Sequence, residues 1–227
     1  MKPGNRILRY VAALGTALAV FSSCIGVGSD ITIRPDGSGS MTLEYRMSRS
    51  LESLGKLDGN ERWPPIPSGR ADFERTAARI EGLKLRSFSA KTTEEDVIHR
   101  LTVDFSRTDA LLQFLDATGQ SASLSRENGK HRLSLTLSRG AAPAPDLVAL
   151  IREAAADYRL DLAFTLPADA ELAFFGEGGR PLGALPSALP SALPVGEAAH
   201  TGRKVSYSAP IGPLLCAAEP LVMEIRW

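Results

Sequence analysis

The sequence predicts an α+β fold: an antiparallel sheet built from repeated strand–strand–helix units, with the helices packed on one face of the sheet. Two observations support the strands. Paired runs alternate apolar and polar residues, and turn dipeptides such as Asp36-Gly37 separate them, as in β-hairpins. A third observation supports the helices, because a segment with helical spacing of apolar residues follows each pair. Since a hairpin sheet has one apolar face, the helices can cover it.

The first predicted unit lies near the N-terminus. Residues 31–33 and 41–45 alternate around the Asp36-Gly37 turn. Leucines at helical spacing in residues 50–57 predict the helix that follows, and Ser50 is a suitable N-cap. Three prolines in residues 58–69 then predict a loop, because proline lacks a backbone donor and fixes φ.

The second predicted unit begins after a helix over residues 73–80. Its strands are residues 83–90 and 97–105, and a helix over 108–115 follows them. The acidic cluster Glu94–Asp96 resembles a metal or acid–base pair at first sight. Because it lies between two strand-like runs, we expect a solvated hairpin tip there.

The third predicted unit contains the strongest hairpin signal of the chain. Asn128-Gly129 separates strands over 122–124 and 133–137, and both turn residues tolerate a positive φ. Asp146 can cap the helix that follows, which runs to residue 154. Further strands are predicted at the C-terminal end, over residues 160–164, 205–207 and 221–227.

Two of the predicted strands share a longer pattern. His99-Arg100-Leu101 matches His131-Arg132-Leu133, and both strands continue with alternating Thr or Ser. Any half-buried strand alternates in this way, so the match fits both an internal repeat and coincidence. Either interpretation leads to the same hairpin architecture.

Residues 176–204 differ in composition from the rest of the chain. Ala-Leu-Pro recurs at 184–186, 188–190 and 192–194. Repeated prolines oppose helix and sheet ladders, so we expect a low-complexity loop insertion within a single α+β domain over residues 30–227.

The N-terminus has the order of a secretory signal. Basic residues precede an apolar run from Tyr10 to Phe21, and two serines and Cys24 follow. This run is short for a membrane span, which needs about 20 apolar residues. The order resembles the lipobox of bacterial lipoproteins, although Phe21 departs from the usual aliphatic residue. The resemblance implies a signal peptide over 1–23, lipid such as palmitate on Cys24, and a tether over 24–29. An ordinary cleaved signal and an uncleaved anchor are the alternatives.

Charge and cysteine content narrow the function classes. Without residues 1–23 the chain has 26 − 3 = 23 Lys and Arg against 26 Asp and Glu, so it lacks the basic excess that nucleic acid requires. With Cys24 lipidated, Cys216 has no partner for an intramolecular disulfide. Its apolar neighbours favour a buried, inert thiol over a nucleophile.

The sequence shows no catalytic motif. His99 and His131 begin alternating strands, where a polar residue on the wet face of the sheet is favoured over a ligand pair, and His200 lies in the expected insertion. No nucleophile elbow, zinc-binding helix or phosphate loop occurs. We therefore expect no enzyme, no cofactor and no metal site.

Two stretches resemble the mycobacterial LppM-like lipoprotein family. SDITIRPDGSGSMTLEYRMS (29–48) has its strand–turn–strand opening, and LDLAFTLPADAEL (160–172) with VSYSAPIGPL (205–214) is similar to its C-terminal part. The resemblance implies an α/β envelope domain and permits a lipid or glycolipid ligand.

Three functions are therefore considered. The first is a non-enzymatic binding or scaffold module, anchored by lipid to the bacterial cell envelope on its periplasmic or surface face. Its partner would be an amphiphile or an envelope protein. The second is a lipid or glycolipid carrier with an apolar pocket. The third is a hydrolase with a dispersed site.

Overall fold

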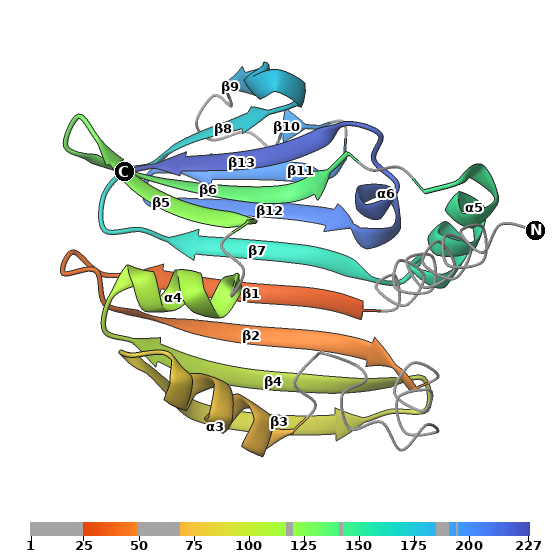
Figure 1. Cartoon of the computed structure of the whole chain (residues 1–227), viewed down its shortest axis with the longest axis horizontal. Coiled ribbons are helices and arrows are strands. Elements are labelled where there is room, and N and C mark those ends of the chain that lie inside the picture. Colours follow the sequence, from red (N-terminus) through yellow and green to blue (C-terminus); the bar gives the residue numbers. More distant parts are fainter. Residues whose placement is uncertain (1–24, 50–68, 117–119, 141–142, 185–190, 194) are drawn as a thin grey trace, which may run out of the picture.

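The alternating strands pair into two β-sheets in the computed structural model, which describes residues 25–49, 69–116, 120–140, 143–184, 191–193 and 195–227. The larger sheet, sheet A, has eight strands in the order β10-β11-β12-β7-β1-β2-β4-β3. The smaller, sheet B, has five in the order β5-β6-β13-β8-β9 (Figure 1). Within both sheets the pairs are antiparallel, except that β1 and β7 run parallel.

The bounds of the strands follow the alternating runs of the sequence. Sheet A contains β1 (Ile25–Ile33), β2 (Gly39–Ser48), β3 (Leu83–Thr92), β4 (Asp96–Phe105), β7 (Arg159–Thr165), β10 (Ser191–Ala192), β11 (Glu197–Thr201) and β12 (Lys204–Pro210). Sheet B contains β5 (Ala122–Glu127), β6 (Lys130–Arg139), β8 (Glu171–Phe175), β9 (Pro181–Ala184) and β13 (Pro220–Arg226).

The helices in the described residues are short. They are α3 (Arg70–Arg79), α4 (Thr108–Leu115), α5 (Pro145–Ala154) and α6 (Ile211–Leu215), with a 3-10 turn η1 (Glu177–Gly179). None of the described helices is long and apolar enough to cross a membrane. The helix predicted over residues 50–57 lies outside the described residues.

The predicted hairpins are confirmed, because each depends on local sequence. The β1–β2 turn contains Gly37 at φ 80°, and the β5–β6 turn contains Asn128 at φ 52° and Gly129 at φ 82°. Pairing is antiparallel in both hairpins and in β3–β4. These turn residues therefore carry the positive φ that their side chains tolerate.

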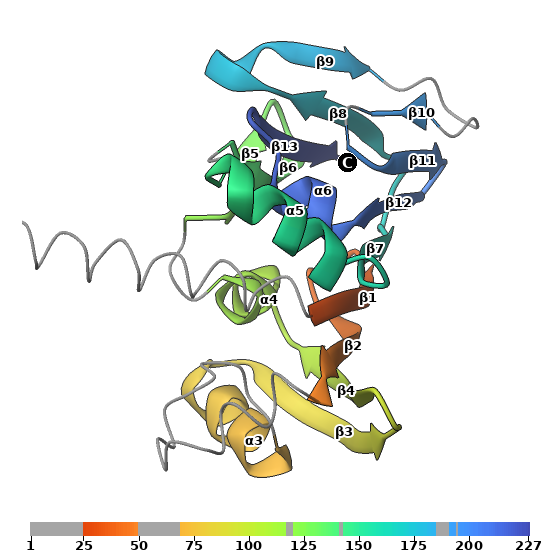
Figure 2. The same ribbon diagram turned by 90° about the vertical axis from the view of Figure 1, so that its right-hand side faces the viewer.

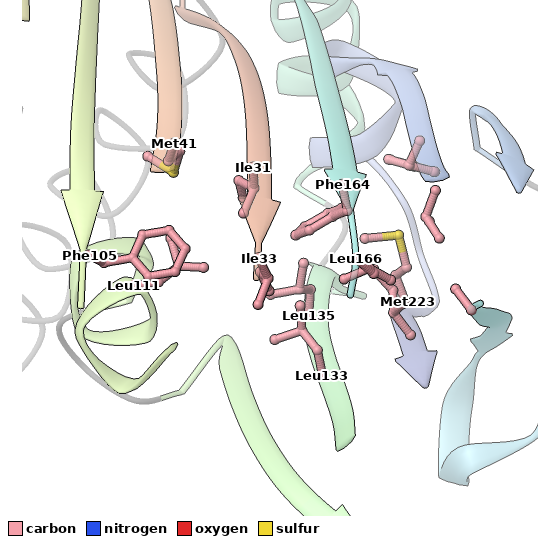
Figure 3. Packing of buried hydrophobic residues seen from close by; sticks show 14 of the residues in the cluster. Ile31, Ile33, Met41, Phe105, Leu111, Leu133, Leu135, Phe164, Leu166 and Met223 are labelled. Atoms are coloured by element: carbon pink, nitrogen blue, oxygen red, sulfur yellow. The ribbon is translucent and has the colours of Figure 1, made fainter. Parts of the chain in front are cut away.

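One face of sheet A is covered partly by helices and partly by sheet B. Figure 2 shows α3, α4 and sheet B on the same side of sheet A. Between the sheets, the rings of Phe174 in β8 and Tyr207 in β12 have centroids 5.8 Å apart. Side chains of Leu135 and Met223 from sheet B gather near Phe164 of β7 (Figure 3). Buried residues of both sheets thus belong to one apolar cluster.

The predicted fold class is wrong. The chain forms a mostly β protein of two packed sheets, and its few short helices do not cover a single sheet in repeated strand–strand–helix units. The third hairpin, β5–β6, joins sheet B through β13 instead of extending the sheet of the first two. The sequence pattern encodes hairpins locally but contains no signal for which sheet a hairpin joins, and the apolar face of sheet A is buried equally well by a second sheet.

Two segments expected to be irregular also contain strands. Residues 25–29, assigned to a tether, form the first half of β1. Within 176–204, the described residues include β9, β10 and β11, so a loop across that whole range does not hold. β9 and β10 are edge strands, and Pro181 is the first residue of β9, a position where proline removes no ladder bond that the sheet needs.

The C-terminal strand that the alternation predicted is present, and it lies at the centre of sheet B. β13 pairs with β6 on one side and β8 on the other. Leu221, Met223 and Ile225 are at most 4% exposed.

Replacing Ile225 by Ala should lower the free energy of unfolding by about 2–5 kcal/mol, because Ile225 is fully buried between β6 and β8 and the substitution leaves a cavity. Chemical denaturation followed by circular dichroism measures the change. Val222→Ala on the same strand is the control, since Val222 is half-buried on the other face, and its cost should be about 1 kcal/mol or less. Equal losses in the two variants would contradict the burial of the Ile225 face of β13.

Candidate functional site

An apolar groove lies on the inner face of sheet A. It has a volume of about 340 Å³. We call it the apolar groove, and its lining is Ile25, Val27, Met41, Leu43, Tyr45, Phe73, Thr76, Phe114 and Leu115.

Four elements form the apolar groove. Its floor is the inward-facing positions of β1 and β2, which alternate with outward-facing polar or glycine positions. One wall is α3, through Phe73 and Thr76, and the other is the last turn of α4, through Phe114 and Leu115. The groove remains because α3 packs on β3 whereas α4 packs on β4 and β5. Neither helix therefore covers the adjacent parts of β1 and β2.

The groove is almost without polar chemistry. The Thr76 hydroxyl donates to the backbone carbonyl of Asp72 at 3.0 Å. The Tyr45 ring stacks on His99 with centroids 4.6 Å apart, and burial raises the pKa of the phenol well above its usual value of 10. Tyr45 is thus neutral at physiological pH. Among the described residues of the lining it is the one titratable group, so the groove suits an uncharged apolar ligand.

The outer face of sheet A has a polar hollow at the same end. Gly26 and Gly28 leave the surface of β1 bare, and the hollow above them has a volume of about 220 Å³. Charged groups surround it, namely Glu44, Arg46, Asp157, Arg159 and Asp161, with Tyr158 beside them. Three acidic and two basic groups balance nearly to neutrality, so the hollow is no anion site.

A buried carboxylate orders this outer face. Asp96 is 2% exposed, its Oδ2 accepts from Nε of Arg46 at 2.5 Å, and its Oδ1 accepts from the Tyr158 hydroxyl at 2.7 Å. The Arg46 guanidinium also lies 5.5 Å from the Tyr158 ring centroid. The hydrogen bond to Asp96 raises the pKa of Arg46. This network ties β2 and β4 to the start of β7.

A second buried carboxylate lies on sheet B. Glu224 is 2% exposed and pairs with Arg132 at 2.5 Å and with Arg226 at 2.7 Å. Arg132 lies on β6, the strand that pairs with β13, and Arg226 lies on β13 itself, two residues after Glu224. Arg132 also pairs with Glu127 at 2.8 Å, so two carboxylates balance two guanidinium groups, and we assign this cluster a structural role.

The predicted histidines do not form a site. His99 is 3% exposed and lies between the rings of Tyr45 and Phe88. The prediction that it lies on the solvent-exposed face of the sheet is therefore wrong. His131 stacks on Trp227 at 5.4 Å, and His200 is 9% exposed in β11. Among the described residues no group of three or more His, Cys, Asp or Glu could hold a metal ion.

The remaining predicted residues are placed as follows. Glu94 and Glu95 form the exposed tip of the β3–β4 hairpin, as expected, whereas Asp96 begins β4 and is buried. Cys216 is a half-buried free thiol. Cys24 lies outside the described residues, directly before β1. The groove was missed because no motif marks it, although the alternation of β1 and β2 and the apolar stripe of α3 were visible.

Comparisons with known proteins give one distant similarity. No family model matches the chain, and no curated protein matches it. Among solved structures, the NMR structure of the folded domain of LppM from Mycobacterium tuberculosis is similar, with 16% identity and a TM-score of 0.40. The match covers 82% of this chain and 90% of the LppM chain. A likeness of this size assigns no function, so function has to be argued from the groove and its surroundings.

Removing the Asp96 side chain should destabilise the protein. In Asp96→Ala the buried Tyr158 hydroxyl and the partly exposed Arg46 guanidinium lose their hydrogen bonds to the carboxylate. We therefore expect the free energy of unfolding to fall by about 1–3 kcal/mol. Urea denaturation measures it, with Glu94→Ala as the matched control on the exposed hairpin tip. The control should stay within about 0.5 kcal/mol of the parent protein. A loss as small as the control's would show that the Asp96 network contributes little to stability.

Proposed function

We propose that this protein is a non-enzymatic lipoprotein of the bacterial cell envelope that holds the apolar chain of an amphiphile in the apolar groove. The observation that carries the proposal is the lining of the groove, in which Tyr45 and Thr76 are the polar residues and neither is charged. A concave lining that is predominantly apolar, with few polar groups, is the usual character of a small-molecule binding site.

The dimensions of the groove favour an extended hydrocarbon chain. Its floor runs along β1 and β2 from Ile25 to Met41, and Met41 pairs with Ile31. Six residue steps of a strand span about 20 Å. One leaflet of a bilayer core is about 15 Å thick, so the floor is comparable in length with an acyl chain. The part of the floor open to such a chain is half-buried Ile25, Val27 and Leu43, since Met41 and Tyr45 are buried.

The chemistry of the groove favours binding over catalysis. Hydrolysis needs a nucleophile or an activated water beside a group that transfers protons. Tyr45 is the one titratable side chain among the described residues of the lining, and burial raises the pKa of its phenol further above physiological pH. The groove therefore offers apolar contact without convergent catalytic groups.

Placement in the envelope rests on the N-terminal segment. The order of basic residues, apolar run and Cys24 supports export, cleavage before Cys24 and lipid attachment to it. Two acyl chains give stable anchoring where one gives marginal binding. In this proposal the membrane is the first partner of the protein, and a membrane amphiphile is its ligand.

Filling the groove should abolish ligand binding. Val27→Trp places an indole over the floor of the groove, and we expect the Kd for a fluorescent C18 polyene fatty acid to rise by about tenfold or more, the equivalent of about 1.4 kcal/mol. Fluorescence titration of the purified protein measures this change. Leu115→Trp, in the α4 wall of the groove, should also raise the Kd. This second variant shows whether the effect of Val27→Trp comes from filling the groove or from a disturbance of β1.

Val222→Trp is the matched control for the groove variants. Val222 is half-buried on the far face of β13 in sheet B, away from the groove lining. Its Kd for the fatty acid should equal that of the parent protein. Unchanged affinity in both groove variants, with their melting temperatures preserved, would rule out the groove as the ligand site.

The anchor is tested separately from the groove. Cys24→Ala should prevent lipid attachment, because the thioether-forming side chain is gone, and the protein should accumulate as an unprocessed or soluble precursor. Membrane fractionation with mass spectrometry of the intact chain measures both effects. A Cys216→Ala variant, altered at the other cysteine, should fractionate like the parent. Identical mature mass and membrane partitioning in Cys24→Ala would exclude Cys24 as the lipid-attachment site.

A further inference from the structure

The fold begins without a spacer after the proposed anchor. Ile25, the residue after Cys24, is already the first residue of β1, pairs with Met47 of β2 and lines the apolar groove. β1 pairs with β2 from Ile25 onward and with β7 from Val27 onward, so a lipid on Cys24 keeps the nearby end of sheet A close to the bilayer. A lipoprotein with a long tether would have no such constraint.

Several elements meet at this end of sheet A. β1 begins at Ile25, β2 ends at Ser48, β4 begins at Asp96 and β7 begins at Arg159. Figure 1 shows α5 at the same end, where it precedes β7. The register of β7 against β1, with Leu160 beside Val27, confirms that the chain leaves α5 next to the start of β1.

α5 presents apolar surface to solvent. Ile151 is fully buried, on the side where α5 meets α6. Leu150, one position earlier, is 47% exposed and is the one large apolar side chain classed as exposed among the described residues. Leu147 and Ala154, at helical spacing from Leu150, are half-buried. These three side chains form a short apolar stripe beside the buried one.

We propose that this end of sheet A rests on the bilayer that holds lipidated Cys24, with Leu150 of α5 inserted into the lipid surface. The proposal rests on the lipid anchorage put forward above. A single exposed leucine binds membranes weakly by itself, but an anchor one residue from β1 raises its effective concentration at the bilayer. The anchor therefore makes a small apolar stripe sufficient to set the orientation of the domain.

This orientation gives the groove a source of ligand. Ile25 lines the groove and is also the residue joined to Cys24, so the groove begins beside the bilayer. The acyl chain of a lipid in the same leaflet can then enter along β1 without crossing bulk water, where every exposed CH₂ group is unfavourable.

Depth-dependent quenching tests the orientation. The full-length protein, lipidated in its host and carrying Cys216→Ala, is labelled with the fluorophore NBD at Leu150→Cys and reconstituted into phosphatidylethanolamine–phosphatidylglycerol vesicles. Some vesicles contain lipids with nitroxide on the upper acyl chain. Arg126→Cys is the matched control, because Arg126 is exposed on β5, and Figure 1 shows the β5–β6 turn at the far end of the molecule from α5.

We expect nitroxide lipids to quench the label at position 150 at least about threefold more than the label at position 126, with a blue shift of its emission, as for an interfacial helix. Equal quenching at the two positions overturns the proposal, and so does the absence of lipid on Cys24. The result is independent of ligand binding: the Val27→Trp change should leave quenching at position 150 intact. If the Val27→Trp variant loses fatty-acid binding and keeps the strong quenching at position 150, both proposals are supported. If the parent protein binds the fatty acid but the labels at positions 150 and 126 are quenched equally, the proposed orientation is wrong and the groove proposal stands.

Discussion

The parallel pair of β1 and β7 is the constraint on which the rest of the molecule depends. All other sheet pairs are antiparallel, and several are local hairpins. A parallel pair needs a long crossover, and here the described part of the crossover contains β2 to β6 and the helices α3, α4 and α5. Because β1 lies between β2 and β7, it joins the N-terminal hairpins of sheet A to the strands that support sheet B. The groove floor and the C-terminal end of α5 are thereby held near one end of sheet A.

β1 also divides the two kinds of surface on sheet A. Its inward positions carry Ile25 and Val27, which face the groove, and its outward positions carry Gly26 and Gly28, which floor a polar hollow. Strand alternation alone separates these environments, without any special backbone geometry. Burial of Asp96 beneath Arg46 and Tyr158 then stabilises the outer face close to the groove end.

Local features were predictable from the sequence, and tertiary assignments were not. The turns at Gly37 and Asn128 require a positive φ that few residue types adopt, so the hairpins followed. Sheet membership depends on contacts distant in the chain, which is why β5–β6 was assigned to the wrong architecture. His99 shows the same limit: histidine is usually polar surface, but here aromatic neighbours from β2 and β3 bury it. The lipidation predicted at Cys24 stays a prediction.

The central position of β13 has a consequence for biogenesis. β13 follows every other strand of sheet B in the chain and lies between β6 and β8, so the pairs β5–β6 and β8–β9 cannot join into one sheet before β13 is synthesised. An unfinished sheet keeps the chain in a non-native state late into synthesis. Under the export proposed above, this order of assembly delays compaction, because the sheet is completed only once β13 has crossed the secretion channel.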